Sequence, residues 1–327
     1  MKRAAALCAS GLVAASCGAL AQAPSAQSYP GKPIRLVVTF AAGGPTDFVA
    51  RVLAAKLTEA FGQSVVVDVR AGASGMIGSD YVAKSVPDGY TLLYGTSTSL
   101  ALAPPLSRKP LYDPVRDFAP VGMVVVVPQL LLVNKSLPVN SVKQLVALAK
   151  AKPGQLNYGS GGTGSTPYFG MELLKLSAGI DVLHVPYKGL APALTDLMGG
   201  QIMLVFHTMQ PSVLELAKSG RLRIIAISSA KRSPAAPNVP TVAEAGVPGF
   251  ENVSWHAMFA PAKTPPDMIA RLNAQLVKTL SEPDLEQRLG DQGAQPSPGT
   301  PETLARFLHD EIERVKRVMQ STGLKPE

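Results

Sequence analysis

The chain contains 327 residues, of which 46% are hydrophobic and 17% are charged. This composition is typical of a folded globular protein and excludes a mainly disordered chain. The 31 lysines and arginines outnumber the 23 acidic residues and give a formal net charge of +8, which is spread along the sequence. A diffuse positive charge favours small anionic partners, and nothing in its pattern indicates nucleic acid.

An export signal is predicted over residues 1–21. Two basic residues at positions 2 and 3 precede a small, apolar stretch that ends in Ala-Leu-Ala at 19–21, the spacing that signal peptidase accepts. We therefore expect cleavage near Gln22 and a periplasmic mature protein. A protein in that compartment meets little nucleotide cofactor, which disfavours a dehydrogenase or a kinase.

Both cysteines, Cys8 and Cys17, fall inside this signal, so the mature chain is expected to have no thiol or disulfide chemistry. Cys17 could instead become a lipid-modified N-terminus. Ala14 stands three residues earlier, where a larger aliphatic residue is usual. A lipoprotein is therefore the less favoured alternative.

Apolar runs with strand character alternate with helical patterns after residue 27, which is typical of α/β units with a largely parallel sheet. The predicted strands are 34–40, 64–69, 91–94, 155–158, 181–186, 202–206 and 222–228. The predicted helices are 48–61, 77–82, 141–152, 167–177, 191–199, 264–280 and 300–323.

Two further apolar segments are predicted to cross between two lobes. Residues 121–133 are too many and too apolar for one ordinary edge strand, and residues 253–259 are apolar enough for the return. Both ends of the chain then build the first lobe, residues 22–122 and 252–327, and the second lobe comprises 123–251. The expected architecture is an α/β fold with a ligand cleft between two lobes.

A glycine-rich turn joins the first predicted strand to the first predicted helix. Its glycines let the backbone approach a ligand or take positive φ, and Thr46 or Asp47 can cap the helix. Free amides at a helix start, with the positive end of its dipole, suit an anion. A tight turn that binds nothing is the alternative. The turn consists of Phe40, Ala41, Ala42, Gly43, Gly44, Pro45, Thr46 and Asp47.

A second glycine-rich turn, residues 159–166, also lies between a strand and a helix. It matches G-x-G-x-x-G at Gly159, Gly161 and Gly164, so dinucleotide binding has to be weighed. That function needs an acid at the far end of the next strand, whereas Asp181 stands at its start. Together the two turns offer amides and hydroxyls to a carboxylate between the lobes, and each such bond contributes about 1.5 to 3 kcal/mol. The available hydroxyls are those of Thr46, Ser160, Thr163, Ser165 and Thr166.

Hydrolase and metal chemistry find little support in the sequence, and we expect no enzyme, metal or cofactor. No G-x-S-x-G motif occurs, and no catalytic base is apparent beside Ser160 or Ser165. The four histidines lack the spacing of zinc ligands, and His184, inside a strand, is interpreted as a core histidine. Trp255, on the return crossing, is a candidate pocket wall, with a core position as the alternative.

Many ordered motifs resemble those of the extracytoplasmic solute receptors of tripartite tricarboxylate transporters, the TctC/Bug family. The resemblance implies a type II periplasmic binding fold that closes on a small carboxylate and delivers it to membrane subunits, with a monomer expected. An exported enzyme, or a sensory subunit that uses the same cleft, is the alternative. The motifs are the segments 29–35, 42–47, 87–91, 111–114, 185–189, 199–202, 239–241 and 260–261.

The resemblance also implies site residues in both turns. In the first it points to Ala41, Ala42, Gly43, Gly44 and Asp47, and in the second to Ser160, Gly161, Gly164, Ser165 and Thr166. Thr96, Ser97 and Thr98 match a third wall. The chain departs from the family pattern at Pro104, Met203 and His207, so the distal end of the pocket and the solute are not assigned.

Overall fold

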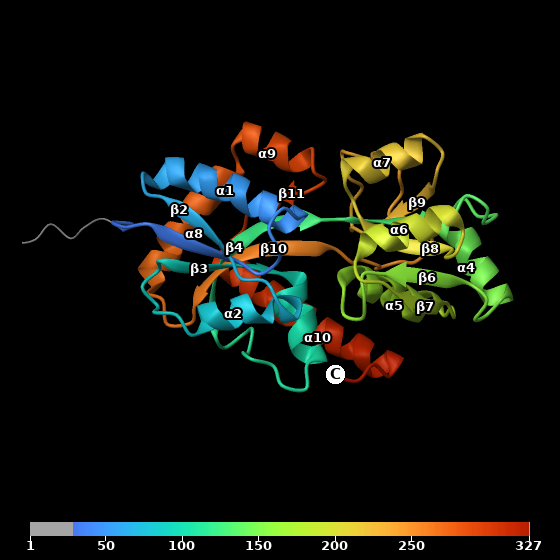
Figure 1. Cartoon of the computed structure of the whole chain (residues 1–327), viewed down its shortest axis with the longest axis horizontal. Helices are drawn as coiled ribbons and strands as arrows, with labels where there is room; N and C mark the ends of the chain where they lie inside the picture. Colours follow the sequence, from blue (N-terminus) through green and yellow to red (C-terminus); the bar gives the residue numbers. More distant parts are fainter. Residues whose placement is uncertain (1–28, 327) are drawn as a thin grey trace, which may run out of the picture.

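The computed structural model describes residues 29–326 as two α/β lobes, each built around its own sheet (Figure 1). The predicted export signal and both cysteines lie outside the described residues. In Figure 1 the left-hand lobe combines blue, teal, orange and red elements, and the right-hand lobe is green to yellow. Both ends of the described chain therefore build one lobe, and its middle builds the other.

The first lobe contains a six-stranded sheet in the order β11-β4-β10-β3-β1-β2. Strand β1 pairs in parallel with β2 and β3, whereas β10 pairs antiparallel with β3 and β4, so the sheet is mixed rather than largely parallel. The strands are β1 (Ile34–Val38), β2 (Val65–Val69), β3 (Thr91–Thr96), β4 (Phe118–Val127), β10 (Ser254–Pro261) and β11 (Gln295–Pro296).

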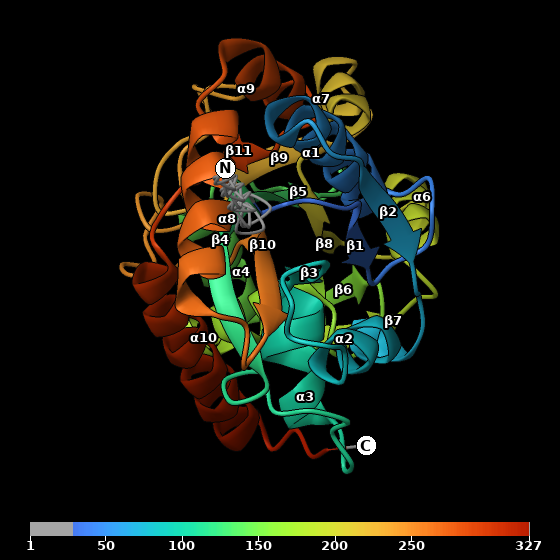
Figure 2. The ribbon, with the colours of Figure 1, turned by 90° about the vertical axis from the view of Figure 1, so that its left-hand side faces the viewer.

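Helices cover both faces of this sheet and bury a separate apolar cluster on each. Helices α1 and α8 pack on one face, and α2 and α10 pack on the other. Figure 2 shows α1 and α9 above the sheet and α2 and α3 below it. The helices are α1 (Pro45–Phe61), α2 (Met76–Ala83), α3 (Ala103–Leu106), α8 (Pro266–Leu280), α9 (Pro283–Gly290) and α10 (Pro301–Thr322), with short turns η1 (Ala73–Gly75) and η2 (Thr98–Leu102).

The second lobe contains a five-stranded sheet in the order β7-β6-β8-β5-β9. Helices α4 and α5 pack on one face of it, and α6 and α7 pack on the other. The strands are β5 (Gln129–Val133), β6 (Asn157–Ser160), β7 (Leu183–Pro186), β8 (Leu204–Thr208) and β9 (Arg223–Ile227), and the helices are α4 (Val142–Ala151), α5 (Thr166–Ala178), α6 (Leu190–Gly199) and α7 (Pro211–Lys218).

The chain crosses between the lobes at a proline. The segment 121–133, predicted to cross between the lobes, contains parts of two strands, β4 and β5, which belong to different sheets and are separated by Pro128. Proline has no N–H for a ladder hydrogen bond, so pairing breaks there and the second sheet starts. The predicted boundary at residues 122 and 123 is therefore too early, because it falls inside β4.

The return crossing lies between Asn252 and Ser254. The Asn252 amide still donates to the Ser228 carbonyl of the second lobe at 2.9 Å, whereas Ser254 begins β10 and pairs with Val127. The two connections are thus adjacent, and Figure 1 shows β4 and β10 side by side where the lobes meet. The two adjacent connections therefore hold the two sheets end to end.

Local signals in the sequence account for most helix ends. Gly62 ends α1 with a left-handed φ of 64°, and the hydroxyls of Ser141 and Thr300 cap α4 and α10. Helices α7 and α9 were not predicted, although each begins at a proline, Pro211 and Pro283, which is favourable in a first helical turn.

Candidate functional site

A cavity of about 730 Å³ lies between the lobes. This volume is within the range of small-molecule sites, roughly 300–1,000 Å³. The first lobe lines it with Phe40, Pro45, Thr46, Thr96, Thr98, Ser254 and His256. The second lobe lines it with residues that include Gln129, Gly161, Ser165, Thr166, His207, Gln210 and Ser212.

The first glycine turn contributes its two flanks to this cavity. Phe40 and Thr46 line the cavity, whereas residues 41–43 are exposed and, like Gly44, are not among the lining residues. Gly43 has φ +81°, which permits the sharp turn into α1. Its amide donates to the Asp47 carboxylate at 2.9 Å and is therefore already occupied.

Asp47 stabilises this turn from inside the lobe. Its Oδ2 accepts from the Gly43 amide and from Arg51 Nε at 2.8 Å, and the side chain is buried. The hydrogen bond from Arg51, ahead of the one from Gly43, holds the Asp47 pKa below its ordinary value. The carboxylate is thus ionised at the start of α1, where it shapes the turn without lining the cavity.

The second glycine turn faces the cavity through Gly161, Ser165 and Thr166. Ser165 Oγ accepts from the Tyr168 amide and caps α5. Gly164, with φ +82°, lies against the other lobe, because a Cβ built there would be 2.8 Å from Leu106 Cδ1. The positive φ favours glycine at this position, and the absence of a side chain lets the two lobes approach closely.

Ser160 has a neighbour that the sequence did not reveal. Its Oγ lies 2.7 Å from His184 Nε2, on the adjacent strand β7, and also contacts the backbone of Gly162. His184 stacks on Tyr158 and contacts Tyr168, and it is half-buried rather than a fully buried core residue. Ser160 itself is 0% exposed and does not line the cavity.

The predicted third wall is split between the cavity and the contact between lobes. Thr96 and Thr98 line the cavity. Ser97 is buried, and its Oγ lies 3.3 Å from both the Thr166 hydroxyl of the second lobe and the Ser254 hydroxyl. Hydroxyls from both lobes thus meet at this wall.

Trp255 is a core residue, and its prediction as a pocket wall is wrong. The side chain is 0% exposed and packs edge-on against Phe307 at 5.6 Å between ring centroids. Successive residues of a strand point to opposite faces of the sheet. Ser254 and His256 therefore face the cavity while Trp255 faces the apolar cluster beneath α10.

Four helix N-termini converge on the cavity, and each places residues of its first turn or cap in the lining. The N-cap residues of α1, α6 and α7 make no side-chain capping hydrogen bond. The first amides of a helix lack intrahelical partners, and each helix carries about half a positive charge at that end. The residues are Pro45 and Thr46 of α1, Thr166 of α5, Leu190 and Ala191 of α6, and Gln210 and Ser212 at α7.

Three buried polar side chains of the lining, those of Gln129, His207 and His256, were not predicted as site residues. All three are buried, and burial lowers the pKa of both histidines, that of His256 to about 4. The His256 Nδ1 lies 3.0 Å from the Tyr94 hydroxyl. The sequence singled out His207 only as a departure from the family pattern. No local sequence signal shows which helices will pack beside a strand residue, because those helices belong to other α/β units.

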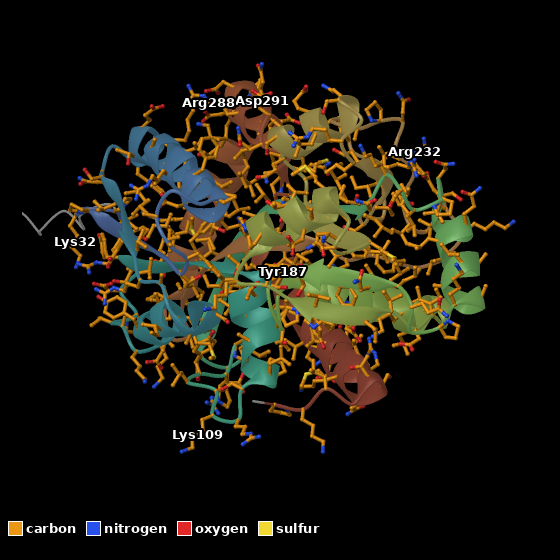
Figure 3. The ribbon with its side chains drawn as sticks, turned by 45° about the vertical axis from the view of Figure 1, so that its right-hand side comes forward. Lys32, Lys109, Tyr187, Arg232, Arg288 and Asp291 are labelled. Atoms are coloured by element: carbon orange, nitrogen blue, oxygen red, sulfur yellow. The ribbon has the colours of Figure 1, made fainter. Side chains whose placement is uncertain are left out.

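No lysine, arginine, aspartate or glutamate lines the cavity in the described part of the chain. Figure 3 shows the labelled charged residues Lys32, Lys109 and Arg232 at the rim of the molecule, with Tyr187 near its centre. Over residues 29–326, no group of three or more histidine, cysteine or acidic side chains could hold a metal ion. The chemistry of the site is therefore hydrogen bonding by neutral groups and backbone dipoles.

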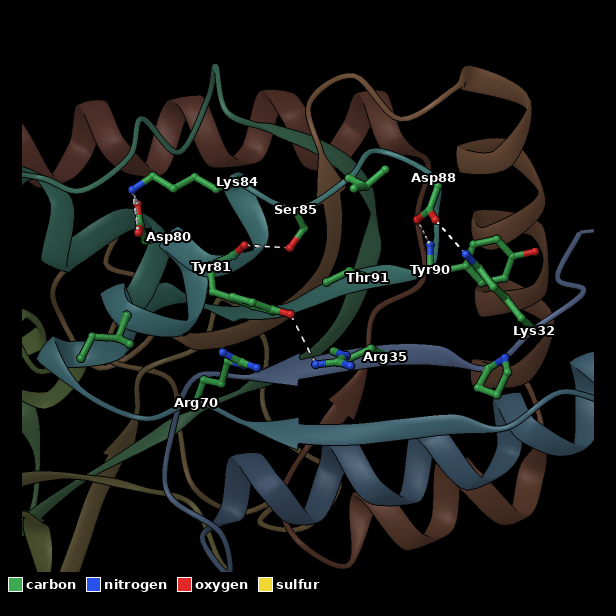
Figure 4. A pocket seen from close by; sticks show the side chains of 13 residues that line it. Lys32, Arg35, Arg70, Asp80, Tyr81, Lys84, Ser85, Asp88, Tyr90 and Thr91 are labelled. Carbon is green, nitrogen blue, oxygen red and sulfur yellow. Dashed lines mark hydrogen bonds and ion pairs between the residues drawn. The ribbon is translucent and has the colours of Figure 1, made fainter.

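A second hollow, of about 830 Å³, lies on the outer surface of the first lobe (Figure 4). Two lysines of its lining pair with acids of the same lining, Lys32 with Asp88 at 3.0 Å and Lys84 with Asp80 at 2.7 Å. It contains no residue of either glycine turn. This groove is therefore separate from the cavity between the lobes.

Comparison with known sequences decides the family. Residues 49–324 match the family described as "Tripartite tricarboxylate transporter family receptor". The chain belongs to this receptor family. The receptor is 42% identical over 317 residues to Protein BugT of Bordetella pertussis (strain Tohama I), with 96% of each chain covered.

Solved structures confirm the two-lobed periplasmic binding fold that the resemblance implied. The receptor superimposes on "R. palustris Rpa4515 with adipate" with a TM-score of 0.78 and 41% identity, covering 91% of this chain and 100% of the other. The MatC protein of Rhodopseudomonas palustris with bound malate gives a TM-score of 0.73 and 33% identity, covering 89% and 99%. Among residues 29–326, no helix combines the length and apolar character that crossing a membrane requires.

Proposed function

We propose that this receptor captures a small carboxylate in the cavity between its lobes and delivers it to the membrane subunits of a tripartite transporter. One observation carries the proposal: four helix N-termini meet in a cavity of about 730 Å³ that no charged side chain lines among the described residues. Such a site attracts an anion without an opposing charge to desolvate.

The carboxylate is held by hydroxyl and amide donors from both lobes. Thr46 offers its hydroxyl from the first lobe, and Ser165 and Thr166 stand at the start of α5 in the second. A hydrogen bond to a charged acceptor contributes about 1.5 to 3 kcal/mol, so a few aligned donors suffice for tight binding. The relatives seen with adipate and malate support this class of ligand.

Closure of the lobes follows from the same geometry. A ligand that contacts both lobes binds the closed form more tightly and shifts the population toward it. The Ser97 and Thr166 hydroxyls, 3.3 Å apart, and the close approach of Gly164 to Leu106 are contacts that opening would break. We propose that the protein acts as a periplasmic monomer after removal of residues 1–21.

Two alternatives use the same cleft. An exported hydrolase would draw on the Ser160 and His184 pair, but the serine is fully buried and outside the cavity, so a substrate has no access to it. A sensory subunit would bind the same solute and pass the signal to a different partner. Deletion of the partner membrane subunits should abolish uptake under the transport proposal and leave it unchanged under the sensory one.

The proposal is tested by thermal melting of the mature protein with a panel of mono-, di- and tricarboxylates, because a ligand that binds only the folded state raises Tm. Gly161→Val should abolish the Tm gain, since the added methyl groups enter the cavity while the native φ is not left-handed. Gly199→Ala, at the far end of α6 with open space around it, is the matched control. If no carboxylate raises Tm, or if Gly161→Val responds like the wild type, the proposal is wrong.

A further inference from the structure

His207 lies at the end of the cavity formed by α6 and α7. It is two residues after Val205 on β8, so both side chains point to the face of the sheet that these helices cover. The His207 ring is buried and lines the cavity. Gln129, opposite Thr208 in the register of β5 and β8, belongs to the other face, beside α5.

The hydrogen bond of His207 fixes its tautomer. Its Nδ1 lies 2.8 Å from the backbone carbonyl of Thr208. A carbonyl oxygen only accepts, so Nδ1 carries the proton, and Nε2 of the neutral ring presents a lone pair. No hydrogen bond to Nε2 is found among the described residues, which leaves this acceptor for a guest.

The surroundings keep the ring neutral. The charged groups of α6 and α7 are engaged elsewhere: Asp196 accepts from the Tyr187 hydroxyl at 2.7 Å, and Glu215 pairs with Lys218 on the exposed side of α7. From the first lobe the titratable residue of the cavity lining is His256, whose pKa is also lowered by burial. Burial lowers the His207 pKa as well, with the Thr208 carbonyl opposing it.

Gln129 supplies a hydrogen-bond donor at the α5 end of the cavity, in contrast to the acceptor that His207 supplies. Asn252 Nδ2 donates to the Thr166 carbonyl at 3.1 Å, which fixes the orientation of the Asn252 amide. The same Nδ2 lies 3.2 Å from Gln129 Oε1, so Gln129 is oriented in turn. Its Nε2 is buried without a hydrogen-bond partner among the described residues. A donor therefore stands near the N-terminus of α5, and an acceptor stands near those of α6 and α7.

We propose that His207 selects carboxylates that carry a hydroxyl group at the end remote from the carboxylate. The inference rests on the proposed function, because it assumes that the carboxylate binds at the α5 end. A hydroxyl donates to His207 Nε2 and accepts from a free amide of α6 or α7. A second carboxylate at that position places lone pairs against the Nε2 lone pair, and a methyl group leaves Nε2 without a partner.

The test is titration calorimetry at pH 7.5 with two chain-matched sets of probes. One set is butyrate, 4-hydroxybutyrate and succinate, and the other is hexanoate, 6-hydroxyhexanoate and adipate. For the set whose length fits, the hydroxy acid should bind the wild type roughly three- to tenfold more tightly than the plain acid, as one hydrogen bond allows. It should also bind more tightly than the diacid.

Three variants separate the role of His207 from a general loss of structure. His207→Phe should remove the advantage of the hydroxy acid, since the phenyl ring has no acceptor. His207→Gln should shift the preference toward the diacid, because its amide can turn a donor to the guest. His309→Gln, on the exposed surface of α10, should change nothing. The Tm of each variant reports whether it folds.

Each result decides between the two proposals. If carboxylates bind but the wild type prefers the diacid or the plain acid, the inference about His207 is overturned and the proposed function stands. The inference is equally overturned if His207→Phe and His207→Gln keep the wild-type preference. If neither these probes nor the wider carboxylate panel bind, the proposed function itself fails.

Discussion

Ser160 Oγ and His184 Nε2 lie 2.7 Å apart, on adjacent parallel strands and 24 residues apart in the sequence. A serine beside a histidine base is an arrangement found in hydrolases. Here the serine is fully buried and also contacts the Gly162 backbone. The pair therefore supports the second glycine turn on the side away from the cavity. The side of the turn that lines the cavity stays available to the ligand.

We expect His184→Ala to weaken carboxylate binding several-fold and to lower the free energy of unfolding by about 1 to 3 kcal/mol, because Ser160 loses a buried partner. Calorimetry and urea unfolding measure the two effects, with His309→Ala on the exposed surface as the control. The wild type should not hydrolyse p-nitrophenyl acetate faster than Ser160→Ala. A serine-dependent rate would revive the hydrolase alternative.

Stability should fall in acid because of His256. Its pKa is lowered to about 4 by burial, whereas the unfolded chain has the ordinary value of about 6.5. The unfolded state thus binds more protons between these values, so this contribution is complete above pH 6.5 and is lost as the pH falls toward 4. Between pH 7 and pH 5 the loss amounts to about 2 kcal/mol.

The matched variant for this prediction is His256→Gln, which cannot titrate but can still hydrogen-bond the Tyr94 hydroxyl. Unfolding by urea at pH 7, 6 and 5 should show a steeper decline for the wild type. The buried His207 and half-buried His184 remain in both proteins and cancel. Parallel declines would show that His256 is not held neutral by the fold.

Alanine should lower the stability of the protein at Gly159 but not at Gly161. A Cβ at Gly159 would lie 2.5 Å from Ile202 Cδ1 and 3.2 Å from Ala193 Cβ, where α6 packs on β6. We therefore expect Gly159→Ala to cost about 1 to 3 kcal/mol of stability through overpacking. At Gly161 the nearest atom is 3.6 Å away, so Gly161→Ala should retain wild-type stability.

The two alanine variants control for each other, because both lie in one turn and differ only in the space available. Thermal unfolding of the unliganded proteins measures the difference. Equal Tm values for Gly159→Ala and the wild type would mean that β6 and α6 are packed less closely than the structure indicates.

Asp47→Ala should destabilise the first turn by about 1 to 3 kcal/mol, because a buried carboxylate then no longer accepts from the Gly43 amide. Ligand affinity should fall with it, since Thr46 is held by the same turn. Arg51→Ala should destabilise the protein clearly less than Asp47→Ala, because the arginine side chain is 54% exposed and solvent screens the pair. Urea unfolding and calorimetry of the two variants test this order, and a larger cost for Arg51→Ala would contradict it.

Much of the local structure was predictable because its signals are short-range. Glycines with positive φ, such as Gly43 and Gly164, and the capping hydroxyls of Ser141 and Thr300 act within a few residues of themselves. The two strand-to-helix turns were therefore found, and so was the resemblance to the receptor family. Helix α7 was not predicted, because it is only eight residues long and only Pro211 marks its start.

The sequence by itself determined that the chain folds into α/β units, that two glycine turns precede helices, and that the family binds solutes. Only the tertiary structure decided which side chains meet. The alternation of one strand turned Trp255 into the core and His256 toward the cavity, and strand pairing brought His184 to Ser160. Contacts of this kind join residues that are distant in the chain, and their free energy depends on packing between units rather than on any local pattern of residues.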